Sequence, residues 1–99
     1  MEILDYVKIS LRISIQDEAI DALLTDLIQA AKLDLTKTAN ISDENFEDSE
    51  LAPLLNRAIA MFVGYNWTFD ERTLNNYKTI YDDLKAKLAT SSAYNDSEE

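Results

Sequence analysis

The chain contains no cysteine and no histidine. Without cysteine it can form neither a disulfide framework nor a thiolate metal site. Without histidine it lacks the commonest general base and the commonest metal ligand. Its single glycine excludes a glycine-rich loop that cradles phosphates. Because these absences remove most routes to catalysis, we expect no enzyme activity and no cofactor.

Carboxylates are the remaining candidates for acid–base chemistry, which requires them in an apolar cleft. Two pairs are close in sequence, Asp17/Asp21 and Asp82/Asp83. The first pair lies at the start of a predicted helix, where the helix dipole favours negative charge, and the second lies on the polar side of the last predicted helix. We therefore interpret both pairs as solvent-exposed surface charge.

Basic residues are scarce, with 9 Lys and Arg against 19 Asp and Glu, so the net charge is −10. Such a chain is repelled by polyphosphates at long range, which disfavours direct nucleic-acid binding. The charge suits a basic protein partner, or a surface to which DNA must not adhere. The first ten residues lack the basic and continuous apolar regions of a signal peptide, so we expect the protein to be cytoplasmic or assembled from the cytoplasm.

One segment, Leu51–Phe69, is more apolar than the rest of the chain. No charged residue occurs between Ala58 and Tyr65, and the apolar side chains of this stretch point to every side of a helix. A helix that is apolar all round is normally buried on several faces. It is too short to cross a bilayer, which takes roughly twenty residues. We predict a central core helix that begins near Pro53 and in which another backbone packs closely at Gly64.

Three amphipathic helices are predicted around this central helix. Glu2–Ser10 has apolar residues at helical spacing. Residues 16–38, capped by Ser14, show the clearest periodicity. Its apolar stripe comprises Ile20, Leu23, Leu24, Leu27, Ile28, Ala31 and Leu35. Between these two helices Leu11–Ile15 alternates apolar and polar residues, which predicts an extended connector, with a short strand as the alternative.

The last predicted helix is capped by Asp70 or Thr73 and carries a narrow apolar seam. The seam comprises Leu74, Tyr77, Tyr81, Leu84 and Leu88. The fold prediction is therefore all-α, a small four-helix arrangement around a central apolar helix, in one domain over residues 1–89. Residues 90–99 are small, polar and acidic, and we expect a disordered acidic C-terminal tail.

Two features are candidate contact sites. Residues 40–50 carry five acidic residues and no base, which we interpret as a solvated acidic loop, with a weak divalent-cation site as the alternative. The aromatic residues Phe62, Tyr65, Trp67 and Phe69 are interpreted as core packing, with a protein interface as the alternative. The candidate partner or channel contacts are Asp43, Glu44, Phe46, Glu47, Asp48, Trp67 and Tyr94.

The order of these parts follows a known pattern. A short N-terminal helix runs into Leu11-Arg12-Ile13, then the acidic pair Asp17-Glu18 precedes the block LLTDLIQAA at residues 23–31. After a loop, Pro53-Leu54-Leu55 opens the apolar helix that ends in Tyr65. This arrangement resembles the head–tail connector (adaptor) proteins of tailed bacteriophages and prophages. The resemblance covers residues 2–67, and the C-terminal third is assigned on physical grounds alone.

The resemblance implies a structural virion protein at the head–tail junction that docks as a ring on the portal and extends the DNA channel toward the tail. The implied partners are the portal protein and head-completion, stopper or tail proteins. The subunit would form a homo-oligomeric ring in the particle and be monomeric when free, and DNA would pass it without specific binding. No membrane would be involved. Two other classes remain open: an acidic helical inhibitor or DNA mimic that binds a basic partner, and a generic helical scaffold module.

Overall fold

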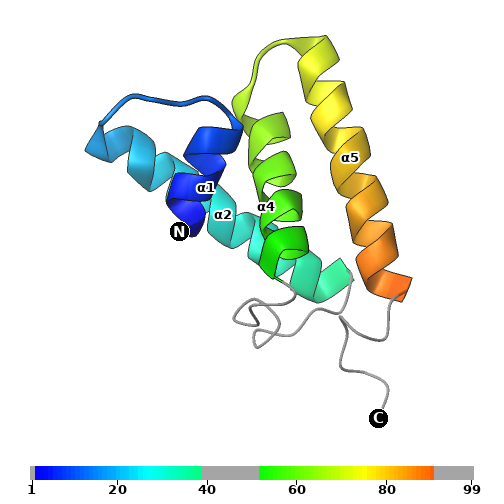
Figure 1. Ribbon diagram of the computed structural model, residues 1–99. Coiled ribbons are helices and arrows are strands. Elements are labelled where there is room, and N and C mark those ends of the chain that lie inside the picture. Colours follow the sequence, from blue (N-terminus) through cyan, green and yellow to red (C-terminus); the bar gives the residue numbers. More distant parts are fainter. Residues whose placement is uncertain (1, 39–51, 91–99) are drawn as a thin grey trace.

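The computed structural model describes residues 2–38 and 52–90. Within these ranges the chain forms four helices and no strand: α1 (Ile3–Ser10), α2 (Glu18–Thr38), α4 (Ala52–Trp67) and α5 (Glu71–Thr90). Figure 1 shows α4 and α5 as an antiparallel hairpin, with α1 and α2 also packed on α4. The predicted all-α class and its four helices are confirmed. Apart from Thr90, the last residue of α5, the predicted tail lies outside the described residues.

The helix α4 lies at the centre, because each of the other three helices makes its most extensive contact with it. Its buried residues are Leu55, Ala58, Ile59, Ala60, Met61, Val63 and Gly64. Four of them are consecutive, and successive helical residues point about 100° apart, so α4 is buried on several sides. The prediction of a central core helix is confirmed.

The C-terminus of α1 is a left-handed turn. Arg12 has a φ of 60°. Its N–H donates to the carbonyl of Ile9 at 3.1 Å, and the N–H of Ile13 donates to the carbonyl of Lys8 at 2.8 Å. This hydrogen-bond pair is a Schellman motif, which is usually built on glycine. The predicted extended connector is therefore wrong at its start, Leu11 and Arg12, because the backbone reverses where the alternating pattern is typical of a strand.

The helix α2 begins at Glu18 because Asp17, and not the predicted Ser14, caps it. Oδ1 of Asp17 accepts the N–H groups of Ala19 at 2.8 Å and of Ile20 at 3.3 Å. Four residues of the predicted stripe are buried, namely Leu24, Ile28, Ala31 and Leu35. Leu23 was expected in the same stripe but is 55% exposed, since it lies about a third of a turn from the core-facing direction.

The α4–α5 hairpin is closely packed at Gly64. A Cβ at this position would lie 2.8 Å from Cδ2 of Tyr77 and 3.1 Å from Cδ2 of Leu11. The close approach was predicted, but the neighbours are side chains of α5 and of the α1 turn, and not another backbone. Farther along α5, Tyr81, Leu84 and Leu88 are buried, so this part of the predicted seam is confirmed.

Candidate functional site

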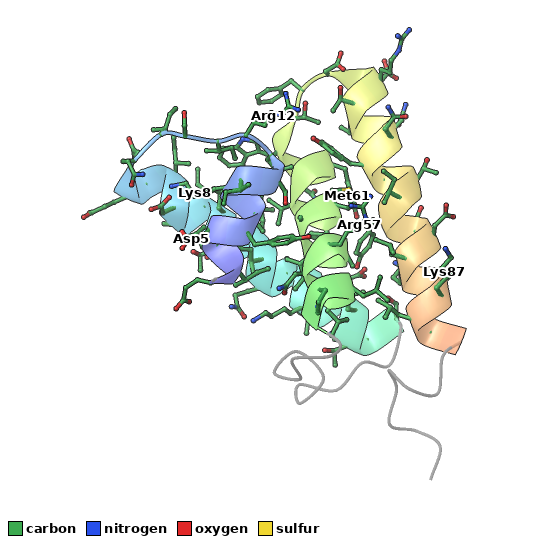
Figure 2. All side chains as sticks on the ribbon, in the orientation of Figure 1. Asp5, Lys8, Arg12, Arg57, Met61 and Lys87 are labelled. Carbon is green, nitrogen blue, oxygen red and sulfur yellow. The ribbon has the colours of Figure 1, made fainter. Side chains whose placement is uncertain are left out.

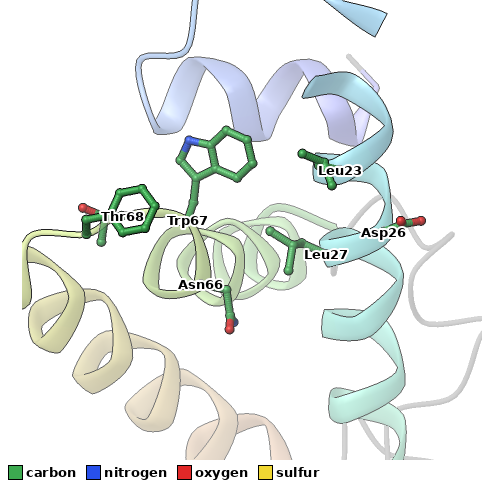
Figure 3. Close-up of a pocket in the computed structure, with 7 residues that line it drawn as sticks. Leu23, Asp26, Leu27, Asn66, Trp67 and Thr68 are labelled. Atoms are coloured by element: carbon green, nitrogen blue, oxygen red, sulfur yellow. The ribbon is translucent and has the colours of Figure 1, made fainter. Parts of the chain in front are cut away.

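An apolar cleft lies where α2 meets the C-terminal end of α4. It has a volume of about 700 Å³. Its lining comprises Leu23, Asp26, Leu27, Asn66, Trp67, Thr68 and Phe69. Figure 3 shows Leu23 and Leu27 of α2 on the side of the cleft that faces Trp67 of α4. Because exposed apolar surface gathered in one place is typical of protein-interaction sites, this cleft is the strongest candidate contact surface in the described part of the chain.

Phe69, whose side chain is fully exposed, lies in the short loop between α4 and α5. Backbone and side-chain hydrogen bonds hold both ends of this loop. The N–H of Thr68 donates to the carbonyl of Gly64 at 3.1 Å. On the other side, Oδ2 of Asp70 accepts the N–H of Thr73 at 3.0 Å and also its hydroxyl. The loop therefore presents Phe69 to solvent from a fixed backbone.

The hydrogen bonds at the start of α5 also change the acidity of its capping residue. The side-chain hydrogen bond from Thr73, and then the backbone hydrogen bond from the same residue, lower the pKa of Asp70 below its ordinary value of 3.8. A charged carboxylate at a helix N-terminus is also favoured by the helix dipole. Of the two predicted caps, Asp70 is therefore the one that the structure uses.

The predicted aromatic residues have different environments. The rings of Phe62 and Tyr65 are half-buried and pack edge-on, with centroids 5.3 Å apart, and Phe62 lies at the same distance from buried Tyr81. The core-packing interpretation is confirmed for these two rings. It is wrong for Phe69, because a residue in the loop between α4 and α5 is not covered by any described helix.

Trp67 is half-buried, packs against the hydrophobic core and lines the cleft. Its contact with a partner stays a prediction. The other predicted contacts, Asp43, Glu44, Phe46, Glu47, Asp48 and Tyr94, lie outside the described residues, as does the alternative cation site at residues 40–50.

Three of the four carboxylates singled out in the sequence have partners in the structure. Asp17 caps α2, and Oδ1 of Asp21 forms an ion pair with Nζ of Lys8 at 2.8 Å. Figure 2 labels Lys8 on α1. Asp82 pairs with Lys78 one turn earlier on α5 at 3.2 Å. The interpretation as surface charge needs one correction, because Asp21 is only half-exposed and joins α1 to α2.

A polar cluster joins α2 to α5, and the sequence reasoning missed it. The hydroxyl of Tyr81 donates to Oδ2 of Asp34 at 2.5 Å, and Nζ of Lys85 donates to the same oxygen at 3.2 Å. Burial raises the pKa of the Tyr81 phenol, and its hydrogen bond to Asp34 raises it further. The phenol therefore stays protonated as a donor, which suits a structural link. The only available signal was Tyr81 in an apolar seam, and Asp34, 47 positions earlier, had no pattern to mark it.

Within residues 2–38 and 52–90, no group of three or more His, Cys, Asp or Glu side chains could hold a metal ion. None of the helices described there is long and apolar enough to cross a membrane.

Charge is divided unequally along the chain. The described ranges hold eleven acidic and nine basic residues, a net charge of −2. Segments 39–51 and 91–99 hold eight acidic residues and no base, the remaining −8 of the total of −10. These segments join the described helices at Thr38, Ala52 and Thr90, three positions that lie at the same end of the molecule (Figure 1). The cleft lies toward the opposite end of α4.

A model of the family described as phage connector protein matches residues 3–95, almost the whole chain. The protein belongs to the phage connector family. The match extends well beyond the resemblance over residues 2–67, so α5, which had been assigned on physical grounds alone, is also part of the connector pattern. A comparison with curated proteins and a comparison with solved structures each found no match. Connectors are structural components of the virion that interact with portal or tail components.

Proposed function

We propose that this connector docks as a ring on the portal of a tailed bacteriophage and extends the DNA channel toward the tail. The observation that carries the proposal is the family match over residues 3–95. The apolar cleft beside Trp67 supports it, since a subunit that joins other proteins needs exposed apolar surface.

The division of charge fits passage of DNA. A wall rich in carboxylates repels the phosphate backbone, so DNA slides past without adhering. In this proposal the acidic residues 43–50 face the channel or a neighbouring ring, and the segment 91–99 contacts a partner when the subunit docks. The alternative of a DNA mimic needs carboxylates in rows without bases, and the described ranges 2–38 and 52–90 carry nine basic residues beside eleven acidic ones.

The direct test is to mix the full chain with purified portal rings. We expect a stoichiometric complex that co-migrates with the portal in size-exclusion chromatography and appears in electron micrographs as an added ring. An unrelated helical protein of similar net charge serves as the control for non-specific attraction. The absence of any complex with the portal of the phage that encodes this chain would rule out the proposal. A stoichiometric complex with a DNA-binding enzyme instead would favour the DNA-mimic class.

A further inference from the structure

The outer face of α2 carries an unusual exposed stripe. Its members are Ala19, Leu23, Asp26, Ala30, Leu33 and Lys37, all exposed and spaced alternately four and three residues apart. This is the spacing of a seam along which one helix packs on another. The stripe lies on the side of α2 away from its buried residues, and all of its members are exposed. Leu23 and Leu33 are each 55% exposed.

The stripe is continuous with the apolar cleft. Leu23 and Asp26 belong to both, and Asp26 is the only charged residue among those that line the cleft. Lys37 is the only basic residue of the stripe. Neither Asp26 nor Lys37 has an ion-pair partner within the described ranges. They lie 11 residues apart on one face, which is about 16.5 Å along the helix.

We infer that two copies of this chain pair through α2 in an antiparallel, two-fold symmetric contact with Ala30 on the axis. In this register Lys37 of one copy lies at the level of Leu23 of the other, about 4.5 Å along the axis from Asp26, which the long lysine side chain can span, and the same contact occurs twice. Leu33 of the second copy then enters the cleft between Leu23 and Leu27. A small residue on the axis lets the two backbones approach closely.

Charge decides between this arrangement and its alternatives. A parallel pairing would place Asp26 beside Asp26 and Lys37 beside Lys37, which repel each other. The antiparallel pairing makes the same surface complementary to itself, as an isologous contact between two identical subunits requires. It also opposes the two helix dipoles.

The size of the contact sets its strength. The helix α2 has 21 residues and is about 31 Å long, so two such helices cover less than the roughly 1,200 Å² of a standard stable interface. We therefore expect a reversible dimer that forms between about 10 μM and about 1 mM protein. Sedimentation equilibrium over this range should show the mass rising from one chain toward two. A single-chain mass up to about 1 mM overturns the inference.

Cross-linking tests the register. The chain has no native cysteine, so an Ala30→Cys variant can form a disulfide only between two copies. Disulfides require Cα atoms within about 7 Å, a condition that a residue on the two-fold axis of closely packed helices can meet. Thr25→Cys, exposed but about a third of a turn away from the stripe, is the matched control. We expect Ala30→Cys to cross-link at least about tenfold faster, and equal rates contradict the register.

Charge reversal tests the pairing of Asp26 with Lys37. Asp26→Lys alone and Lys37→Asp alone should each weaken dimerisation about tenfold, because both symmetric pairs become repulsive. The double variant should recover to within about threefold of the original protein. Failure of the double variant to recover overturns the assignment of this pair.

Apolar contact is tested by Leu33→Glu, which should leave the protein monomeric. The control is Ile9→Glu on α1, since Ile9 is 65% exposed and lies outside the stripe. Circular dichroism checks that both variants keep their helix content. These experiments use the connector alone. The dimer can therefore be absent while the portal complex still forms, and the portal complex can be absent while the dimer is still found.

Discussion

At the scale of single residues, the packing of the α4–α5 hairpin depends on the absence of one side chain. Gly64 is buried at the start of the last turn of α4, and glycine within a helix costs about 1 kcal/mol relative to alanine. The compensating feature is the ring of Tyr77, which occupies the space a Cβ would need. Propensity and packing therefore oppose each other at this position, and their magnitudes decide which effect is larger.

We predict that Gly64→Ala lowers the free energy of unfolding by about 1 kcal/mol. Overpacking typically costs about 1–3 kcal/mol, which exceeds the gain of about 1 kcal/mol in helix propensity. Urea denaturation measures the change. In a Tyr77→Ala background the ring is gone, so there the same Gly64→Ala substitution should stabilise the protein. A substitution that stabilises in both backgrounds would mean that Tyr77 does not restrict this site.

At Arg12 the conflict between residue type and backbone is reversed, because this residue carries a Cβ in a left-handed conformation that favours glycine. The left-handed conformation costs residues other than glycine about 1–2 kcal/mol. Part of this cost is offset by the larger conformational entropy that glycine loses on folding. We predict that Arg12→Gly stabilises the protein by about 0.5–1 kcal/mol. Arg12→Ala keeps the Cβ and removes the same charge, so it should give no such gain. Equal stabilisation by both variants would assign the effect to charge.

At the scale of elements, each helix depends on how its ends are closed. The start of α5 is closed by the carboxylate of Asp70, whose pKa is lowered by its hydrogen bonds from Thr73. A carboxyl group whose pKa is lower in the folded state than in the unfolded state stabilises the fold at pH values above its ordinary pKa, which is 3.8 for Asp70. That stabilisation is lost as the pH falls through the lower folded-state pKa.

We therefore predict a pH-dependent difference between the original protein and Asp70→Asn. Asparagine also caps helices but does not titrate in this range. The original protein should be the more stable of the two near neutral pH, and its advantage should shrink as the pH falls below 3.8. Urea denaturation from pH 7 downward measures it, and carboxylates common to both chains cancel. Asp83→Asn, on the same helix, is the control and should show no comparable change. A constant difference for Asp70→Asn across the acid range would contradict the assignment.

Sequence periodicity predicted the three amphipathic helices, because each has an apolar face that repeats with the helical period, and the central helix was predicted from its uninterrupted apolar run. Their ends were harder, since Ser14 and Asp17 are both capping residues and only the backbone path decides between them. The turn at Arg12 was missed because its neighbours alternate like a strand. The cleft could not be predicted, since Leu23 and Trp67 are 44 positions apart in sequence and come together only in the folded chain.

At the scale of the whole molecule, the connector has two different ends. The described helices are nearly neutral, and the acidic segments 39–51 and 91–99 join them at one end. The apolar cleft lies toward the other end of α4, a helix of 16 residues and about 24 Å. A subunit whose acidic segments join the helices at one end and whose apolar cleft lies toward the other can meet two different surroundings, which is what an adaptor between two structures requires.

Removal of residues 91–99 tests whether this acidic segment contacts a partner. Every buried residue of the described core lies at or before Leu88, so truncation after Thr90 should change the free energy of unfolding by less than about 0.5 kcal/mol. We predict that the truncated connector nevertheless joins fewer heads to tails, measured as infectious particles formed when it replaces the full chain. A matched variant that keeps the segment but carries Asp96→Asn, Glu98→Gln and Glu99→Gln separates loss of charge from loss of chain. If truncation alone impairs joining, the segment makes contact through its side chains or backbone. If both variants impair joining, the charge of the segment is required, which indicates a basic partner surface. Undiminished joining by the truncated chain would exclude a docking role for this segment.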